Sequence, residues 1–339
     1  MKRVLIIRLD AIGDYVLWRN CLRFLRNHGK YSNAHLTVLG NPVWRNIAET
    51  LDGDLVDEWI WIEDRDSLFK KGWENLLPRC VWYRRVTAAQ KRLKAKLSKL
   101  GFDEIVSPAA FTDPLLDEFV SGIAPVAISV DSGDRTRTCK FTRLLNSGKD
   151  SFVFYRNRSI VSDLAGVECD VQFELELNET PAKTNKILFF DSASHWTRCW
   201  PSRRWRKLQS MLPPGFEPVS IPRGRGLADF VSFVKSCAAV VSNDTMALHV
   251  AAALGVPVVG VVNGVSGKGA FWPYPSSLGK KVEVCIPKNI PSVPIPLLGS
   301  RIAQYLALSS VSCRMVADAL HRALELKSCL KHGISQSEV

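Results

Sequence analysis

The sequence lacks the long apolar runs and the clustered cysteines that mark several common classes of protein. No stretch of about 18 or more apolar residues is present, so no membrane-spanning helix is expected. The nine cysteines are scattered singly, with no C-x-x-C pair and no Cys/His cluster at zinc-ligand spacing. We therefore predict a soluble cytoplasmic protein with reduced thiols and no bound metal.

Acidic residues are in the minority, because 45 Lys and Arg outnumber 33 Asp and Glu to give a formal net charge of +12. This excess predicts an acidic partner, and nucleic acid, anionic lipid or a phosphorylated substrate would each satisfy it. The sequence contains no helix-turn-helix, zinc or RNP-type signature, so a nucleic-acid-binding protein is disfavoured. A dehydrogenase is disfavoured because no G-x-G-x-x-G follows the first strand.

Strand and helix patterns alternate along the chain, which is typical of parallel sheets covered by helices. With 339 residues, the chain is long enough for two domains of ordinary size. A polar, proline-containing run at 178–185 marks the change of domain. We predict an α/β fold with two Rossmann-like, doubly wound domains at 1–180 and 186–310, followed by a C-terminal helix and tail at 311–339.

Apolar runs and helical spacing place the individual elements. Strands are predicted at 3–8, 35–39, 56–62, 102–106, 186–190 and 238–241, and helices at 15–26, 205–212, 227–236 and 312–326. A polar segment at 131–151, rich in Arg, Lys, Ser and Thr, is predicted to be a loop or a segment that becomes ordered on binding.

A basic segment runs from Arg79 to Lys99 without an acidic residue. Its apolar residues fall on one helical face, namely Val86, Ala89, Leu93, Leu97 and Leu100. A basic amphipathic helix of this kind suits an anionic membrane surface. The alternative is a helix whose apolar face packs on the sheet and whose cationic face is solvated.

The loop after the first strand carries two carboxylates at the carboxyl edge of the predicted sheet. Gly13 is expected to form a tight turn, and Asp14 directly precedes the predicted helix. A carboxylate at this edge can accept the proton of a hydroxyl as a general base, whereas the alternative role for Asp14 is a helix N-cap. Asp10 lies in the same loop and is the second candidate, its alternative role being a local Asx hydrogen bond.

Two motifs in the second half suit a diphosphate. Ser194, Thr197 and Arg198 follow the strand at 186–190 and supply hydroxyl donors and a positive charge. The alternative for Arg198 is an ordinary solvated basic face shared with neighbouring arginines.

The second of these motifs is the polar turn between a strand and a helix, which holds Asp244. The backbone N–H groups of Thr245 and Met246 and the Thr245 hydroxyl are candidate phosphate donors there. His249 lies five residues after Asp244 on the helix that follows. It is expected either to face the same site or to be a packed core histidine.

A glycine-rich segment from Val262 to Pro275 contains Lys268, whose side chain is long enough to reach a phosphate. It also contains Phe271 and Trp272, which are candidates for stacking on a base or sugar. It is not a Walker loop, because Gly269 stands where Ser or Thr is required. The alternative is a turn-rich loop anchored by its aromatic residues.

The three motifs at 8–14, 192–201 and 242–249, in this order, resemble glycosyltransferase family 9, the bacterial heptosyltransferases of lipopolysaccharide synthesis. The resemblance implies the GT-B architecture, with two Rossmann-like domains facing a cleft, and inverting transfer without a metal or cofactor. It implies catalytic roles for Asp14 and Arg198, and an acceptor side at Asp10 and Gly13. The donor side would comprise Ser194, Thr197, Asp244, Thr245, Met246, His249 and Lys268.

The resemblance also implies the partners. The donor would be a nucleotide-diphospho-sugar, with ADP-heptose as the first expectation, and the acceptor a glycan or glycolipid. A peripheral contact of the protein with the inner face of the inner membrane is a further expectation. This chain departs from the family in having Met246 and Ala247 where Gly and often Pro follow the Asp-Ser/Thr pair. The competing hypothesis is a catalytically silent sugar-nucleotide-binding protein with the same fold.

Overall fold

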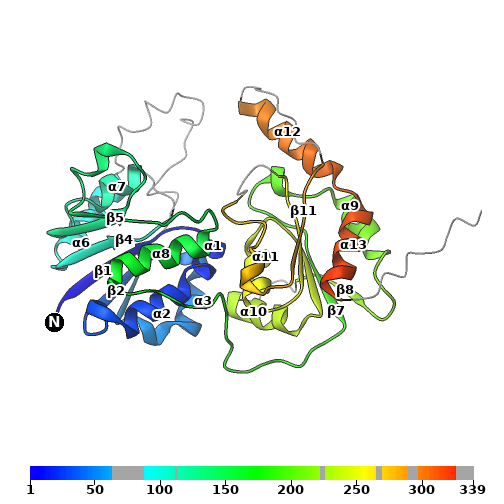
Figure 1. Cartoon of the computed structure of the whole chain (residues 1–339), viewed down its shortest axis with the longest axis horizontal. Helices are drawn as coiled ribbons and strands as arrows, with labels where there is room; N and C mark the ends of the chain where they lie inside the picture. Colours follow the sequence, from blue (N-terminus) through cyan, green and yellow to red (C-terminus); the bar gives the residue numbers. More distant parts are fainter. Residues whose placement is uncertain (63–87, 111–113, 222–225, 265–268, 289–296, 326–339) are drawn as a thin grey trace, which may run out of the picture. The chain divides into compact units, whose positions relative to one another are not determined.

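The computed structural model describes residues 1–62, 88–110, 114–221, 226–264, 269–288 and 297–325. The chain divides into two compact units, unit 1 at Met1–Phe173 and unit 2 at Glu174–Val339. Each unit contains one parallel β-sheet packed between helices (Figure 1). The predicted α/β class is confirmed. In this division residues 174–180 go with the second unit, and so does the helix near the C-terminus.

Unit 1 has a six-stranded sheet in the order β3-β2-β1-β4-β5-β6. The strands are β1 Arg3–Arg8, β2 His35–Gly40, β3 Glu58–Trp61, β4 Glu104–Ser107, β5 Val126–Val130 and β6 Arg143–Leu145. The prediction of a loop throughout 131–151 is wrong, because β6 pairs with β5 at the edge of the sheet, from Ile128 with Arg143 to Val130 with Leu145. Successive residues of β1 are buried on both sides, as expected for a strand inside a covered parallel sheet.

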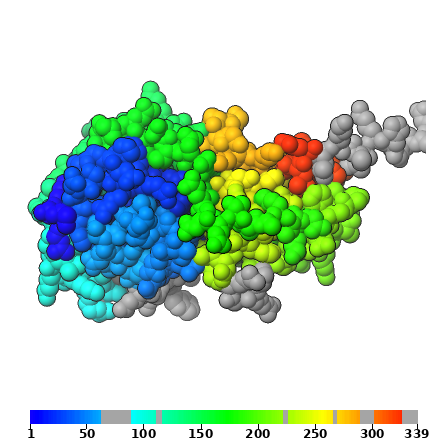
Figure 2. Space-filling model, turned by 90° about the horizontal axis from the view of Figure 1, so that it is seen from below, coloured from blue at the N-terminus to red at the C-terminus, as the bar shows by residue number. Residues whose placement is uncertain are grey.

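The helices of unit 1 are α1 Ile12–Val16, α2 Arg19–Asn27, α3 Arg45–Leu51, α6 Ala88–Ser98, α7 Pro114–Val120 and α8 Val153–Ala165. Figure 2 shows α2 and α3, in blue, on the surface of this unit. The prediction of one helix at 15–26 is wrong, because the helix is interrupted at Leu17 and Trp18, between α1 and α2. Asn157 Nδ2 of α8 donates to the Leu17 carbonyl at 3.0 Å, which takes that carbonyl out of the helical hydrogen-bond pattern.

The basic helix α6 packs on the sheet of unit 1. Leu97 is fully buried, and Ala89, Leu93 and Leu100 contact the same core cluster as Leu5 of β1. Within the described part of the segment 79–99, the docked helix with a solvated cationic face is therefore the arrangement observed. Residues 79–87 lie outside the described ranges.

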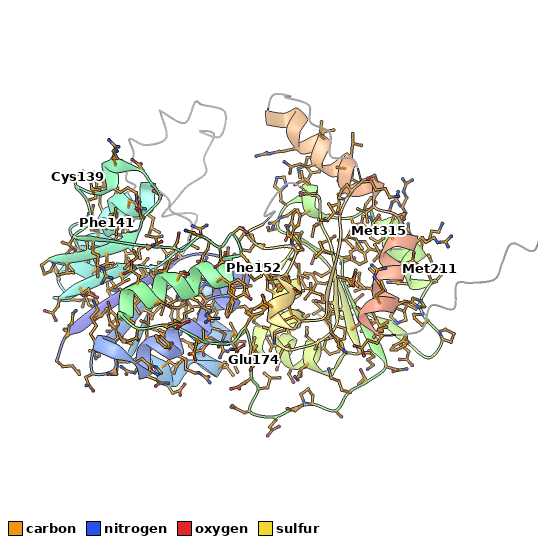
Figure 3. All side chains as sticks on the ribbon, in the orientation of Figure 1. Cys139, Phe141, Phe152, Glu174, Met211 and Met315 are labelled. Atoms are coloured by element: carbon orange, nitrogen blue, oxygen red, sulfur yellow. The ribbon has the colours of Figure 1, made fainter. Side chains whose placement is uncertain are left out.

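Unit 2 has a five-stranded parallel sheet in the order β11-β10-β9-β7-β8. The strands are β7 Lys186–Phe190, β8 Glu217–Val219, β9 Ala239–Asn243, β10 Val258–Val261 and β11 Val282–Cys285. The helices are α9 Ser202–Gln209, α10 Leu227–Ser236, α11 Met246–Ala253, α12 Leu297–Ser310 and α13 Cys313–Ala323. The core between the sheet, α9 and α13 includes two partly buried methionines, Met211 and Met315 (Figure 3). In the ranges described, no helix is both long and apolar enough to cross a bilayer.

Each sheet has one point at which the order of its strands reverses. In unit 1 this point lies between β1 and β4, and in unit 2 between β7 and β9. Ligands of doubly wound sheets bind outside the carboxyl ends of the strands at such a point. The loops after β1, β7 and β9 carry most of the residues for which the sequence predicts chemistry, so these candidate residues lie at the switch points.

Gly40 at the end of β2 provides a test of the packing beside the first of these loops. A Cβ at this position would lie 2.5 Å from ring atoms of both Trp44 and Trp61. The Trp44 indole also stacks on Tyr15 and donates to the Asp10 carbonyl at 3.2 Å, so it has little freedom to move. We expect Gly40→Ala to lower the free energy of unfolding of unit 1 by about 1–3 kcal/mol, the usual cost of overpacking.

The measurement is urea unfolding followed by tryptophan fluorescence, with each transition fitted separately because two units need not unfold together. Gly53→Ala is the matched control, since a Cβ there would meet nothing within 4 Å. Equal midpoints for the two variants would contradict the packing described at Gly40.

Candidate active site

Arg8 is a buried cation at the carboxyl end of β1, only 1% exposed. Its Nη1 donates to the Pro108 carbonyl after β4 at 2.9 Å, and its Nη2 forms an ion pair with Asp10 Oδ2 at 2.6 Å. The guanidinium also lies over the Trp18 ring at 4.8 Å, a cation–π contact. Arg8 therefore ties the ends of β1 and β4 together across the switch point of unit 1 and orients Asp10.

Sequence analysis did not single out Arg8. The available signal was one charged residue at the end of an otherwise apolar strand, since a charge is rarely fully buried unless it is paired.

Within the described residues, only one of the two carboxylate oxygens of Asp10 has a partner. Oδ2 is held by Arg8, while Oδ1 is buried without a hydrogen-bond partner there. The backbone of Asp10 is fixed as well, because its carbonyl accepts from Asn41 Nδ2 at 3.1 Å and from Trp44 Nε1 at 3.2 Å. Asp10 is thus a fixed acceptor and not a simple Asx turn.

Asp14 is half-buried and lies within α1, not before it. Ala11 occupies the N-cap position, and Asp14 Oδ2 accepts from the Ala11 N–H at 3.2 Å. The alternative role of Asp14 as a helix N-cap is therefore wrong, although its carboxylate does satisfy one N–H at the start of the helix. Gly13 is also helical and is not at positive φ, so the tight turn predicted for it is wrong.

A buried ion pair anchors α1 and α2 behind this loop. Asp52 receives two hydrogen bonds from Arg19, at 2.9 and 2.6 Å, and one from the Tyr15 hydroxyl at 2.7 Å. Burial, and then the neighbouring carboxylate of Asp52, raise the pKa of Tyr15 well above its ordinary value, so the phenol remains a donor. Removing one partner from such a pair leaves an uncompensated charge in the core.

Arg198 is the central group of the switch point in unit 2. It ends the 3₁₀ helix η6 Trp196–Arg198, where its Nη2 donates to Ser194 Oγ at 2.5 Å and its Nη1 donates to the Asp244 carbonyl at 3.3 Å. The Arg198 and Asp244 side chains form an ion pair at 3.9 Å. The structure therefore brings together three of the residues that the sequence assigns to the donor side, Ser194, Arg198 and Asp244, and leaves the guanidinium partly exposed.

Thr197 is buried, and its hydroxyl hydrogen-bonds to His195 Nδ1 at 2.8 Å. The His195 ring nitrogen also accepts from the Thr197 N–H at 3.3 Å, which closes the N-terminal end of η6. Thr197 thus shapes the loop that carries Arg198.

Asn243, the last residue of β9, fastens this loop to the sheet. Its Nδ2 donates to the Asp191 carbonyl at 2.6 Å, and its Oδ1 accepts from the Trp200 N–H at 3.0 Å. Both ends of the segment carrying Arg198 are therefore held by one fully buried amide. Sequence analysis did not identify this role; the signal was an amide at the end of an apolar strand, where a buried polar group needs partners.

The start of α11 is capped by Thr245, whose Oγ1 accepts from the Ala247 N–H at 3.3 Å. Ser242 Oγ lies 3.2 Å from the same oxygen. Met246 is the first helical residue and is half-buried. Burial raises the pKa of Asp244, and the nearby Arg198 partly offsets that rise.

His249 is 5% exposed, and its Nδ1 lies 2.5 Å from the Tyr274 hydroxyl. Burial lowers the pKa of His249 to about 4, so the ring is neutral near pH 7. Burial, and then Asp244, raise the pKa of Tyr274 well above its ordinary value. His249 thus has the partner that a packed histidine needs, and its connection to the site runs through Tyr274, which sequence analysis missed.

The glycine-rich segment contributes less than predicted in its described part. Trp272 is fully buried, so the prediction that it could stack on a ligand is wrong, while Phe271 lies 5.7 Å from the His249 ring. Lys268 lies outside the described residues. Over the described ranges, no group of three or more His, Cys, Asp or Glu side chains is placed to hold a metal ion.

The buried neutral state of His249 predicts a pH dependence of stability. Its pKa is about 4 in the folded chain and about 6.5 when unfolded, so between these values the unfolded chain binds more protons. The His249 contribution is present above about pH 6.5 and is lost as the pH falls towards 4, by about 3 kcal/mol in all. The test is to measure the free energy of unfolding between pH 4 and 7 for the natural chain and for His249→Gln, whose side chain cannot titrate. Parallel curves would contradict the assignment.

Comparison with known proteins adds to this geometry. Residues 221–283 match glycosyltransferase family 9, described as heptosyltransferase. No curated protein sequence matches the chain.

Solved structures match over nearly the whole chain. The E. coli heptosyltransferase WaaC with ADP-2-deoxy-2-fluoro heptose has 17% identity and a TM-score of 0.67, covering 94% of this chain and 99% of that one. A family 9 glycosyltransferase from Veillonella parvula DSM 2008 has 17% identity and a TM-score of 0.65, with 96% and 97% covered. E. coli ADP-heptose lps heptosyltransferase II has 16% identity and a TM-score of 0.60, with 96% and 99% covered.

These structural similarities show that the chain has the GT-B fold. The family 9 match itself covers residues 221–283, which lie within unit 2.

Proposed function

We propose that the protein transfers a sugar, with heptose as the first candidate, from an ADP-linked donor to a glycan or glycolipid acceptor, with inversion and without a metal ion. The observation that carries the donor half of this proposal is the position of Arg198 at the switch point of unit 2. Its guanidinium is held by Ser194 and by the Asp244 carbonyl, close to the start of α11. A partly exposed guanidinium beside a helix N-terminus suits a diphosphate.

Similar proteins support the choice of nucleotide. WaaC of E. coli has been determined with ADP and with ADP-2-deoxy-2-fluoro heptose. In the present chain Met246 is the first residue of α11, the position at which the family usually has glycine. The Met246 side chain would narrow the approach of a phosphate to the N–H groups there, so we assign the main phosphate contacts to Arg198 and Ser194.

The acceptor half of the proposal is assigned to unit 1. The Asp14 carboxylate would take the proton of an acceptor hydroxyl as that oxygen attacks the anomeric carbon opposite the diphosphate. The bond between the anomeric carbon and the diphosphate oxygen breaks, and Arg198 stabilises the negative charge that develops on the departing ADP. Each of the two effects is worth about 3 kcal/mol of the barrier. The hydrogen bond from Ala11 fixes Asp14 Oδ2, and the ion pair with Arg8 fixes Asp10 as a second acceptor beside it.

The base assignment predicts that Asp14→Asn lowers kcat about 10²- to 10⁴-fold, because the amide cannot accept the proton. Affinity for ADP should be unchanged, since the nucleotide is assigned to unit 2. The assays are ADP release in the presence of acceptor and calorimetric titration with ADP. Asp54→Asn, a change of an exposed carboxylate in the same unit, is the control. Normal turnover in Asp14→Asn would rule out the base role.

The leaving-group assignment predicts that Arg198→Ala lowers kcat about 10²- to 10³-fold. Arg198→Lys should recover part of that loss, because the charge is restored without the paired donors. Arg206→Ala, on the exposed side of α9, is the control and should keep full activity when both variants are assayed with an acceptor in solution. If Arg198→Ala and Arg206→Ala behave alike, Arg198 belongs to the solvated basic face and not to the donor site.

The silent-binder hypothesis is separated by a donor screen. ADP-, UDP- and GDP-sugars are compared by thermal shift, and each mixture with acceptor is analysed for released nucleotide by mass spectrometry. An active enzyme releases its nucleotide, whereas a silent binder is stabilised by the donor and releases none.

A further inference from the structure

The exposed large hydrophobic side chains of unit 2 gather at one place. Among its described residues they are Trp196, Ile302 and Leu306, which are 45%, 47% and 60% exposed. Ile302 and Leu306 are one helical turn apart on α12, and the Trp196 ring lies 5.5 Å from the Tyr305 ring. We call these four residues the α12 surface. A contiguous apolar surface of this kind marks an interaction site more often than single exposed residues do.

The chain around the α12 surface carries positive charge only. No Asp or Glu occurs in 192–216, in 284–288 or in 297–317, the described residues on and around this surface. Their exposed described cations are Arg203, Arg206, Lys207, Lys288, Arg301 and Arg314.

The segment 192–216 and the residues from α12 to the start of α13 are joined in space. The α12 helix packs on η6, the Trp200 indole donates to the Val311 carbonyl at 3.1 Å, and Cys313 Sγ lies 3.5 Å from the Arg204 carbonyl. The C-terminal part of α12 and the starts of α9 and α13 therefore form one corner of unit 2. Figure 1 shows α12, in orange, along the outside of this unit.

We propose that the α12 surface and its surrounding cations dock the protein on an anionic phospholipid bilayer. Aliphatic side chains on one face of a helix enter the boundary between headgroups and acyl chains, and tryptophan prefers the same depth. The neighbouring cations are attracted to anionic headgroups. The basic helix α6 lacks the first of these properties, because its apolar residues are used in the core of unit 1.

Charge favours a bilayer over a second copy of the chain. Two copies meeting through this corner would bring the same cations together, and like charges across an interface oppose association. Trp196 and Arg198 also share η6, so the docking surface is continuous with the candidate active site. A membrane-borne acceptor would thus be met on the side of unit 2 that holds the donor.

The test is co-sedimentation of the full-length protein with vesicles of phosphatidylcholine alone and of phosphatidylcholine with 30% phosphatidylglycerol. We expect binding to the anionic vesicles that is weakened by salt. The double variant Ile302→Ser/Leu306→Ser should reduce the partition coefficient at least tenfold, and Arg301→Gln/Arg314→Gln should reduce binding to the anionic vesicles. These side chains are exposed, so circular dichroism should show the natural fold in both variants.

Two controls separate this site from other surfaces. Val43→Ser/Val126→Ser removes exposed apolar residues from unit 1, and Lys91→Gln/Arg92→Gln removes charge from α6; both should bind as the natural chain does. Binding that is unaffected by the α12 changes, or absent from anionic vesicles, would overturn the proposal. So would a dimer seen by sedimentation velocity that is lost in Ile302→Ser/Leu306→Ser, since a second copy would then be the occupant.

Discussion

The buried amide of Asn243 is the constraint on which the arrangement of unit 2 depends. It joins the end of β9 to both ends of the segment after β7, through Asp191 and Trp200, at the point where the strand order reverses. A hydrophobic residue would leave a carbonyl and an N–H unsatisfied in the interior, and each such loss costs about 1–3 kcal/mol. The amide thereby fixes the segment in which Arg198 meets Ser194 and the Asp244 carbonyl.

In unit 1 the two loops at the switch point are held together by a different buried polar side chain. There the Arg8 guanidinium connects the ends of β1 and β4 and takes Asp10 as its counter-ion. A charge in this position is stabilised by pairing, hydrogen bonding and the Trp18 ring together. In both units the parallel sheet brings two loops to one edge, and one buried polar side chain holds them in register. The polar side chains of the candidate site therefore lie at the ends of rigid strands, and rigid elements hold side chains more precisely than loops do.

Much of this was predictable from local pattern. The apolar runs of β1 and β7 and the helical spacing of α10 give their observed bounds, and the loops after β1, β7 and β9 follow from the alternation of strands and helices. Features that depend on distant residues were not predictable. The interruption between α1 and α2 depends on Asn157 of α8, which binds the Leu17 carbonyl. The segment β6 is a strand because it pairs with the edge of β5. Likewise, the partner of His249 is 25 residues away, in a loop that sequence alone does not fold.

The central claim is that the switch point of unit 2, fastened by Asn243, binds the diphosphate of the donor. A crystal structure of the protein with ADP tests it most directly. The account predicts diphosphate oxygens within hydrogen-bond distance of the Arg198 guanidinium and Ser194 Oγ, with η6 still held by Asn243. A diphosphate bound elsewhere in the chain, with Arg198 facing solvent, would contradict it.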